Sequence, residues 1–240
     1  MKLQSAIHML FPPRCLNCGD ETASDFVLCA PCWRDTPFVS GQICDLCGMP
    51  LPGGLATEIA HCDSCLIAPK PWRRGRAALL YDGTARRLVL RLKYGDRLDL
   101  APALAGWMAD AGRELALAQS LCVPVPLHWR RLFNRRYNQA ALLAEALAKR
   151  TGAAYCPDLL RRLRATKKQE GMRRAERQEN QRDAFGVTTR HRAKLAQRRV
   201  VLVDDVMTSG ATLASCAETC LAAGAIEVNV LVLARVARET

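Results

Sequence analysis

The chain has 240 residues, enough for one α/β domain and a smaller attached module. Its hydrophobic content of 50% and charged content of 24% are those of an ordinary globular protein. We expect a cytoplasmic protein, because no stretch approaches the roughly 20 apolar residues of a membrane span and the N-terminus has no apolar signal region or Ala-x-Ala site. The net charge of +12 lies entirely in residues 77–240 and favours anionic partners, with a merely soluble basic surface as an equal alternative on charge alone.

Four Cys-x-x-Cys pairs dominate the first seventy residues. Each pair has the spacing of a zinc knuckle, in which a tight turn directs two thiolates at one tetrahedral ion. Two structural Cys₄ zinc sites are predicted, with disulfides or an iron–sulfur cluster as the alternative. Sequential pairing is the simplest arrangement, and interleaved pairing stays open. The predicted ligands are Cys15, Cys18, Cys29, Cys32, Cys44, Cys47, Cys62 and Cys65.

Residues 67–76 contain two prolines and three arginines and are predicted to link this module to the main domain. We therefore expect a double zinc-ribbon module over residues 1–70 and a second domain over residues 71–240. In that domain, strands are expected at 77–81, 121–126, 184–187 and 225–234, a strand and a short turn over 154–160, and helices at 84–92, 98–118 and 140–149. Pro102 is expected to open or break the second helix, and Asn138 to cap the third.

Two arginine-rich segments follow predicted strands. One contains Arg130, Arg131, Arg135 and Arg136, interleaved with aromatic residues, and is expected to hold pyrophosphate or another anion. The other, residues 161–182, has nine Lys/Arg against three Asp/Glu and is predicted to form a basic flap or a nucleic-acid contact surface. Its candidate flap or DNA residues are Arg164, Lys167, Lys168, Arg173, Arg174 and Arg177. The alternative is that the aromatic residues belong to the core and the arginines serve only pyrophosphate.

The rest of the chain is organised around residues 199–213. The aliphatic run 200–203 predicts a buried strand that ends at two carboxylates, and a short polar turn then leads into a helix over residues 213–223. This order places backbone N–H groups and the positive end of a helix dipole around a phosphate. The acids are expected to hold sugar hydroxyls or a hydrated Mg²⁺. The candidate ligand residues are Asp204, Asp205, Thr208, Ser209, Gly210, Ala211 and Thr212.

This run resembles the signature of the type I phosphoribosyltransferases, which has an aliphatic strand, two acids, two apolar residues and a Thr-Thr/Ser-Gly-x-Thr turn. The alternatives are a Walker B strand or a plain core strand with a capped helix. A Walker B strand requires a P-loop, and the sequence contains no G-x-x-x-x-G-K-[ST]. The resemblance implies a ligand such as phosphoribosyl pyrophosphate (PRPP) or ribose 5-phosphate, bound with Mg²⁺.

The combination of cysteine pairs with this loop resembles the ComF family over essentially the whole chain. Further matching segments are 123–126, 136–140, Thr166-x-x-Gln169, Arg177-x-x-Asn180 and Ala184-Phe185. The resemblance implies a type I phosphoribosyltransferase-like parallel sheet flanked by helices. It also implies a cytoplasmic role in handling imported single-stranded DNA, with DNA-uptake or recombination proteins as partners.

Two functions of different classes follow. In the first, the protein is a competence and DNA-utilisation factor that binds single-stranded DNA and uses the PRPP loop as a ligand or regulatory site. In the second, it is an active phosphoribosyltransferase that transfers ribose 5-phosphate from PRPP to a base or amine. The sequence identifies no residue as a general base, so no catalytic residue is assigned. The zinc module could also dock protein partners under either function.

Overall fold

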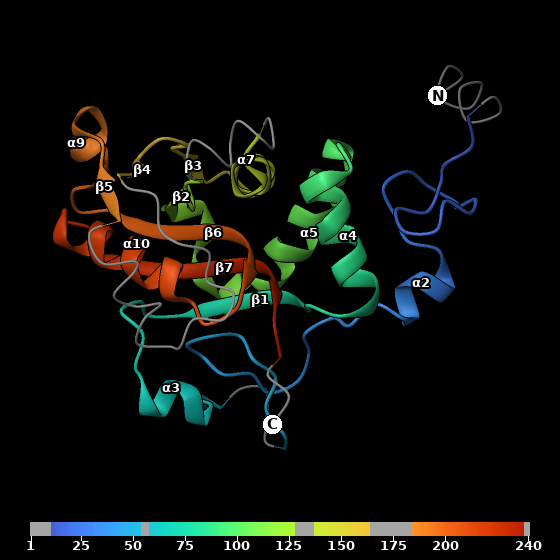
Figure 1. The fold of residues 1–240 in the computed structure, drawn as a ribbon, viewed down its shortest axis with the longest axis horizontal. Coiled ribbons are helices and arrows are strands. Elements are labelled where there is room, and N and C mark those ends of the chain that lie inside the picture. The colour runs from blue at the N-terminus through green and yellow to red at the C-terminus, as the bar shows by residue number, and fades with distance from the viewer. Residues whose placement is uncertain (1–10, 54–57, 128–136, 164–183, 238–240) are drawn as a thin grey trace.

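The computed structural model describes residues 11–53, 58–127, 137–163 and 184–237 (Figure 1). At its centre is a five-stranded parallel sheet with the order β1-β7-β6-β2-β3. Its strands are β1 (Gly75–Leu80), β2 (Ser120–Pro124), β3 (Ala154–Tyr155), β6 (Arg199–Met207) and β7 (Glu227–Arg235). A separate antiparallel pair consists of β4 (Leu160–Arg162) and β5 (Phe185–Val187).

The described helices connect and cover these strands. The α-helices are α2 (Ala30–Arg34), α3 (Asp63–Ile67), α4 (Gly83–Tyr94), α5 (Ala101–Ala111), α7 (Gln139–Thr151), α9 (Arg192–Leu195) and α10 (Ala211–Ala222). Short 3₁₀ turns are η1 (Leu98–Leu100), η2 (Arg113–Leu115), η3 (Leu117–Gln119) and η4 (Thr189–His191). The predicted cap of α7 is confirmed, because the Asn138 side chain accepts a hydrogen bond from the backbone N–H of Ala140.

Each face of the sheet packs against a different set of elements. Leu88 of α4, Leu104 of α5 and Leu143 of α7 share one core cluster with alternate residues of β6 and β7. On the other face, α10, α9, the β4–β5 pair and the second group of cysteines share a second cluster with the remaining sheet residues. Because both faces are covered, residues 200–203 and 228–234 are continuous buried runs, as the sequence predicted. The predicted α/β architecture is therefore confirmed.

Two expected elements differ from the structure. The helix expected over residues 98–118 ends at Ala111, and two 3₁₀ turns follow, separated by Ala116 in the left-handed region at φ 49°. Pro102 lies in the first turn of α5, where its missing N–H costs little. The strand expected at 184–187 does not rejoin the main sheet, because β5 pairs antiparallel with β4. Local patterns identify a strand, but they do not identify its partner.

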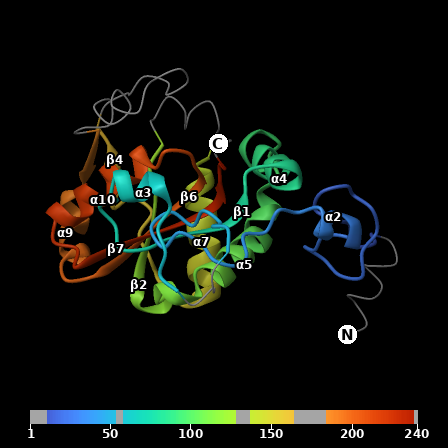
Figure 2. The ribbon, with the colours of Figure 1, turned by 90° about the horizontal axis from the view of Figure 1, so that it is seen from below.

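The two cysteine-rich segments occupy different places. The segment around α2 lies beyond α4 at one end of the molecule, whereas the segment around α3 lies against the sheet (Figures 1 and 2). Among the described residues, no helix combines the length and apolar character needed to cross a bilayer.

Candidate functional site

The predicted phosphate loop joins β6 to α10 at the carboxyl edge of the sheet. Gly210 immediately precedes α10 and has φ 77°, a left-handed conformation that favours glycine. A Cβ at this position would lie 3.1 Å from the ring of Trp72, so a larger residue would also crowd the loop. The Ser209 hydroxyl accepts a hydrogen bond from the backbone N–H of Ala211, 3.4 Å away, at the first turn of the helix. Backbone and hydroxyl donors thus gather at the positive end of α10.

The strand before the loop is longer than expected. The sequence predicts that both acids follow the strand, but β6 continues to Met207 and includes them. Neighbouring strand residues point in opposite directions, and the two carboxylates have different surroundings. Asp204 lines a small cavity together with residues 206–208 and 210–213. Asp205 is buried, and its carboxylate lies 3.1 Å from the Lys93 ammonium on α4.

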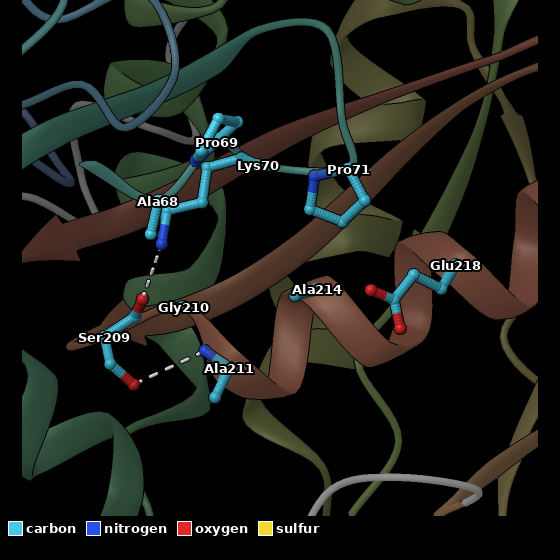
Figure 3. Close-up of a pocket in the computed structure, with 9 residues that line it drawn as sticks. All are labelled: Ala68, Pro69, Lys70, Pro71, Ser209, Gly210, Ala211, Ala214 and Glu218. Carbon is cyan, nitrogen blue, oxygen red and sulfur yellow. Dashed lines mark hydrogen bonds between the residues drawn. The ribbon is translucent and has the colours of Figure 1, made fainter. Parts of the chain in front are cut away.

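A second cavity lies on the other side of the same loop. It is lined by Ser209, Gly210 and the first two turns of α10, and by the segment 68–71 that follows α3 (Figure 3). Lys70 reaches across to the loop, and its ammonium donates to the Ser209 carbonyl oxygen at 3.1 Å. The segment predicted as a simple linker is therefore one wall of the loop's surroundings.

The eight N-terminal cysteines form two groups of four. Within each group the four Sγ atoms lie within 4.8 Å of one another, and the pairing is sequential. Sγ–Sγ distances are 3.5 Å between Cys18 and Cys29 and 3.7 Å between Cys47 and Cys62. Thiolates about 2.3 Å from a tetrahedral zinc lie about 3.8 Å apart, whereas a disulfide brings two sulfurs to about 2.0 Å. All twelve cysteines are free of disulfides, so the donor set fits zinc.

Hydrogen bonds favour the thiolate form of one cysteine in each group, Cys15 and Cys44, whereas the pKa values of Cys18, Cys29, Cys47 and Cys65 are raised. Backbone N–H groups of Asn17 and Cys29 donate to the Cys15 sulfur at 3.4 and 3.2 Å. Burial raises the pKa of Cys15, but backbone N–H donors outweigh it and lower the pKa to about 6. In the second group, hydrogen bonds from Cys47 and Cys65 hold the pKa of Cys44 well below its ordinary value. Each site has four protein ligands, which is typical of structural zinc.

Comparison with known families matches both parts of the chain. Residues 6–66 match the double zinc ribbon domain, and residues 138–240 match the phosphoribosyl transferase domain. The DNA utilization protein YhgH of Salmonella typhimurium is 33% identical over 231 residues, which cover 93% of this chain and 97% of the relative. Competence protein F of Haemophilus influenzae is 29% identical over 229 residues, which cover 92% and 96%. The chain belongs to the ComF family.

Solved structures give more distant likenesses to this ComF-family chain. The allosteric regulatory enzyme of purine biosynthesis aligns with 60% of the chain and 30% of its own, at 22% identity and a TM-score of 0.39. A protein of Thermus thermophilus aligns with 58% of the chain and 85% of its own, at 17% identity and a TM-score of 0.35. These values are too low to support a statement about function.

Several predicted site residues lie outside the described residues. The anion-loop candidates Arg130, Arg131, Arg135 and Arg136 are among them, as are the flap candidates Arg164, Lys167, Lys168, Arg173, Arg174 and Arg177. The structure does describe their neighbours Tyr137, whose hydroxyl donates to the Leu92 carbonyl at 2.9 Å, and Arg161 and Arg162 in β4. The first three residues of the expected flap, 161–163, are therefore the last two residues of β4 and the residue that follows it.

A third potential metal-binding group occurs away from the ribbons. Cys156, Asp158 and His191 each place a ligand atom within 4.8 Å of the others. Asp158, however, already pairs with His191 at 2.8 Å and with Arg190. Burial, together with the nearby Lys194 and Arg190, lowers the pKa of His191, and these cations would also repel a metal ion. We interpret this group as an ion-pair cluster that fixes the segment after β5.

Four residues that contact the phosphate loop or its acids were not predicted from the sequence of this ComF-family chain. They are Lys70, Trp72, Lys93 and Arg235. A tryptophan inside a short basic linker, and an arginine directly after a continuous apolar strand, are the only signals that the sequence offered. Lys93 gave no signal, because a lysine in the last turn of a helix is ordinary.

Proposed function

We propose that the chain is a cytoplasmic competence and DNA-utilisation protein that assists the handling of imported single-stranded DNA and binds a PRPP-type ligand at residues 204–212. The observation that carries the ligand assignment is the strand–loop–helix cradle with Asp204 beside it. The relatives' names, DNA utilization protein and Competence protein F, support the biological role. Membership of the ComF family connects the ligand assignment with the biological role.

The cradle suits a phosphorylated ribose. The hydroxyls of Thr208, Ser209 and Thr212 and the N–H groups at the start of α10 are donors for a 5-phosphate. The Asp204 carboxylate accepts from ribose hydroxyls, and together with the ligand's own phosphates it is a suitable oxygen donor for Mg²⁺. Asp205 is available only when its pairing with Lys93 is exchanged for the ligand. We assign Asp204 the larger part in binding, because it lines the small cavity beside the loop.

Calorimetry with PRPP and Mg²⁺, and separately with ribose 5-phosphate, tests this assignment. Asp204→Asn should weaken binding about 10–100-fold, since hydrogen bonds to a charged group contribute about 1.5–3 kcal/mol. The double variant with Asp205→Asn should bind at least as weakly. Asp99→Asn is the matched control, because Asp99 is an exposed partner of Arg97 away from the loop. Unchanged affinity in the double variant would exclude these residues from the ligand site.

Single-stranded DNA is the proposed polymer ligand, because the whole formal excess of positive charge lies in residues 77–240. Binding should be independent of sequence, tighter than to duplex, and steeply weakened by salt. Replacing Arg173, Arg174 and Arg177 by Ala should weaken it and flatten the salt slope. The control is Arg86, Arg113 and Arg192 replaced by Ala, three exposed arginines on other elements. No salt-dependent binding by the wild type would contradict the proposal.

Phosphoribosyl transfer is the second candidate, supported by the match of residues 138–240 to the phosphoribosyl transferase domain. Release of pyrophosphate from PRPP with added purine, pyrimidine or amine acceptors separates the two functions. Acceptor-dependent release together with absent DNA binding would favour the enzyme. DNA binding without release would favour the DNA-handling role.

A further inference from the structure

Two cations bind the backbone carbonyl groups of the phosphate loop. The Arg235 guanidinium donates to the carbonyl oxygens of Met207 and Val236, each at 3.1 Å, and to that of Thr208. Lys70 donates to the next carbonyl, that of Ser209, at 3.1 Å (Figure 3). Three consecutive carbonyl oxygens of the loop, from 207 to 209, are therefore fixed by positive charge.

This arrangement determines where the loop's amide hydrogens point. In a planar trans peptide, the C=O and the following N–H point in opposite directions. Because each of the three carbonyls points toward a cation, the N–H groups of Thr208, Ser209 and Gly210 point away from these cations. Successive backbone N–H groups are the donors of an anion-binding nest. Lys70 and Arg235 thus act on the cradle through the backbone, without touching its ligand.

Lys70 is positioned by the second zinc ribbon. It is two residues before Trp72, and its ammonium lies 5.8 Å from the centre of the Trp72 ring. The Trp72 indole N–H donates to the Leu46 carbonyl at 2.6 Å, and its ring lies against Gly210. Leu46 is in the turn between Cys44 and Cys47, two ligands of the second zinc site. A continuous series of contacts therefore joins this metal site to the phosphate loop.

The first ribbon has different neighbours. Arg91 of α4 donates to the carbonyls of Leu16 and Asn17, and Arg87 donates to the Asn17 side chain at 3.1 Å. Leu16 and Leu28 belong to the core cluster on the α4 side of the sheet. None of the contacts described for this ribbon reaches residues 207–210.

We propose that the second zinc ribbon, acting through Trp72 and Lys70, holds the phosphate loop in its anion-binding conformation. Metal bound by Cys44, Cys47, Cys62 and Cys65 therefore sets the affinity of the loop for its ligand, whereas metal in the first ribbon does not. Lys70 is a positioning residue in this scheme. This proposal rests on the proposed phosphate site where ligand affinity is measured, and it does not rest on that site where hydrogen exchange is measured.

The first experiment removes the Lys70 charge. Lys70→Met should raise the dissociation constant for ribose 5-phosphate and for PRPP with Mg²⁺ about tenfold, with an unchanged melting temperature and zinc content. Lys70→Arg should recover most of the affinity, because it keeps a donor to the Ser209 carbonyl. Lys149→Met is the control, since Lys149 is an exposed lysine on α7. Equal affinity of Lys70→Met and wild type would overturn the proposal.

The second experiment compares the two metal sites directly. Cys62→Ser should weaken ligand binding at least tenfold, whereas Cys18→Ser should leave it within twofold. Zinc content, measured by elemental analysis, should fall by one ion per chain in each variant. Equal losses of affinity would overturn the specific role of the second ribbon, and Lys70→Met keeps the proposal testable if Cys62→Ser does not fold.

A readout without ligand separates this proposal from the proposed function. Amide hydrogen exchange at Ala211 and Ala214, whose N–H groups donate to the Ser209 hydroxyl and the Gly210 carbonyl, should accelerate about tenfold in Lys70→Met and should be unaffected in Cys18→Ser. If the wild type binds neither ribose 5-phosphate nor PRPP, the proposed function fails, and the exchange rates still decide whether the ribbon holds the loop. Unchanged exchange in Lys70→Met would overturn the proposal.

Discussion

The two zinc ribbons share a motif and differ in what they pack against. In each, a Cys-x-x-Cys-Gly knuckle directs thiolates to a four-sulfur site. The first lies beyond α4 at one end of the molecule and contributes Cys15, Leu16, Leu28 and Cys32 to the core cluster on the α4 side of the sheet. The second contributes Cys44, Cys47 and Cys65 to the same core cluster as β6, β7 and α10. The two ribbons therefore belong to different core clusters, the first to the one that contains α4 and the second to the one that contains α10.

The glycine that follows each knuckle shows how differently the two ribbons pack against the rest of the protein. Gly19 and Gly48 both have positive φ, at 86° and 67°. A Cβ on Gly19 would meet nothing within 4 Å, whereas a Cβ on Gly48 would lie 2.7 Å from the backbone nitrogen of Ala77 in β1. The same turn is thus open in the first ribbon and pressed against the sheet in the second. The importance of a structural metal depends on the surface that its turn supports.

The largest expected effect comes from removing one buried ligand from each site. Cys47→Ser should lower the melting temperature of the whole protein by about 10–20 °C, because the knuckle that ends at Gly48 lies directly against Ala77 in β1. Cys32→Ser should lower the melting temperature of the sheet by less than half as much while the first ribbon loses its fold. Circular dichroism with zinc analysis measures both. Equal losses would show that the two ribbons are integrated alike.

A smaller effect is expected from the paired glycines. Gly48→Ala should destabilise the protein by about 2–4 kcal/mol, because backbone strain adds to a clash with β1. Gly19→Ala should cost about 1 kcal/mol, from strain alone. Chemical denaturation measures the two free energies of unfolding. Similar costs would contradict the close packing of the second knuckle.

Detaching the first ribbon should have a local effect. Arg91→Ala removes the donor to the carbonyls of Leu16 and Asn17 and should loosen the ribbon by about 1.5–3 kcal/mol. Limited proteolysis should then cut residues 11–35 faster, while ligand affinity at the phosphate loop stays unchanged. The exposed Arg86 on the same helix supplies the control, Arg86→Ala. A loss of ligand affinity in Arg91→Ala would connect the first ribbon to the loop.

The smallest effect concerns pH. Burial raises the pKa of Glu227, but hydrogen bonds from Arg73 in the linker and from Asn229 outweigh it and lower the pKa below its usual value. This pair therefore stabilises the fold above the unfolded-state pKa of about 4.3, and the contribution disappears as the pH falls through the lower folded-state pKa. Arg73→Gln should reduce the dependence of stability on pH in that acidic range. If stability falls with acidic pH equally in Arg73→Gln and in the wild type, the pair does not anchor the linker.

The sequence predicts what depends on local pattern. Cysteine spacing identified both metal sites, since a knuckle needs only a few neighbouring residues. The run from Val200 to Gly210 identified the strand, the loop and the presence of the next helix for the same reason, although β6 continues to Met207 and α10 begins at Ala211 instead of Leu213. Asn138 was recognised as a cap because its preference is a property of the residue and its immediate successors.

The contacts that complete the loop could not be predicted in this way. Lys70 lies 139 residues before Ser209 in the chain, and no local preference links them. The pairing of Asp205 with Lys93 requires knowing that α4 passes the end of β6. β5 was misplaced because a short apolar run fits any free strand edge. Partners chosen by the fold, rather than by neighbouring residues, are what the sequence leaves undetermined.

The parallel pairing of β1 with β7 has a consequence for how the protein is made. Gly75 is paired with Val230 and Leu80 with Arg235, so among the described strands the one that follows the linker pairs with a strand more than 150 residues later. At synthesis rates of about 5–20 residues per second, that partner emerges roughly 10–30 s after β1. During this interval β1 presents an open hydrogen-bonding edge, which is a risk for aggregation. The second ribbon can take up metal early, but the sheet edge it rests on is assembled last.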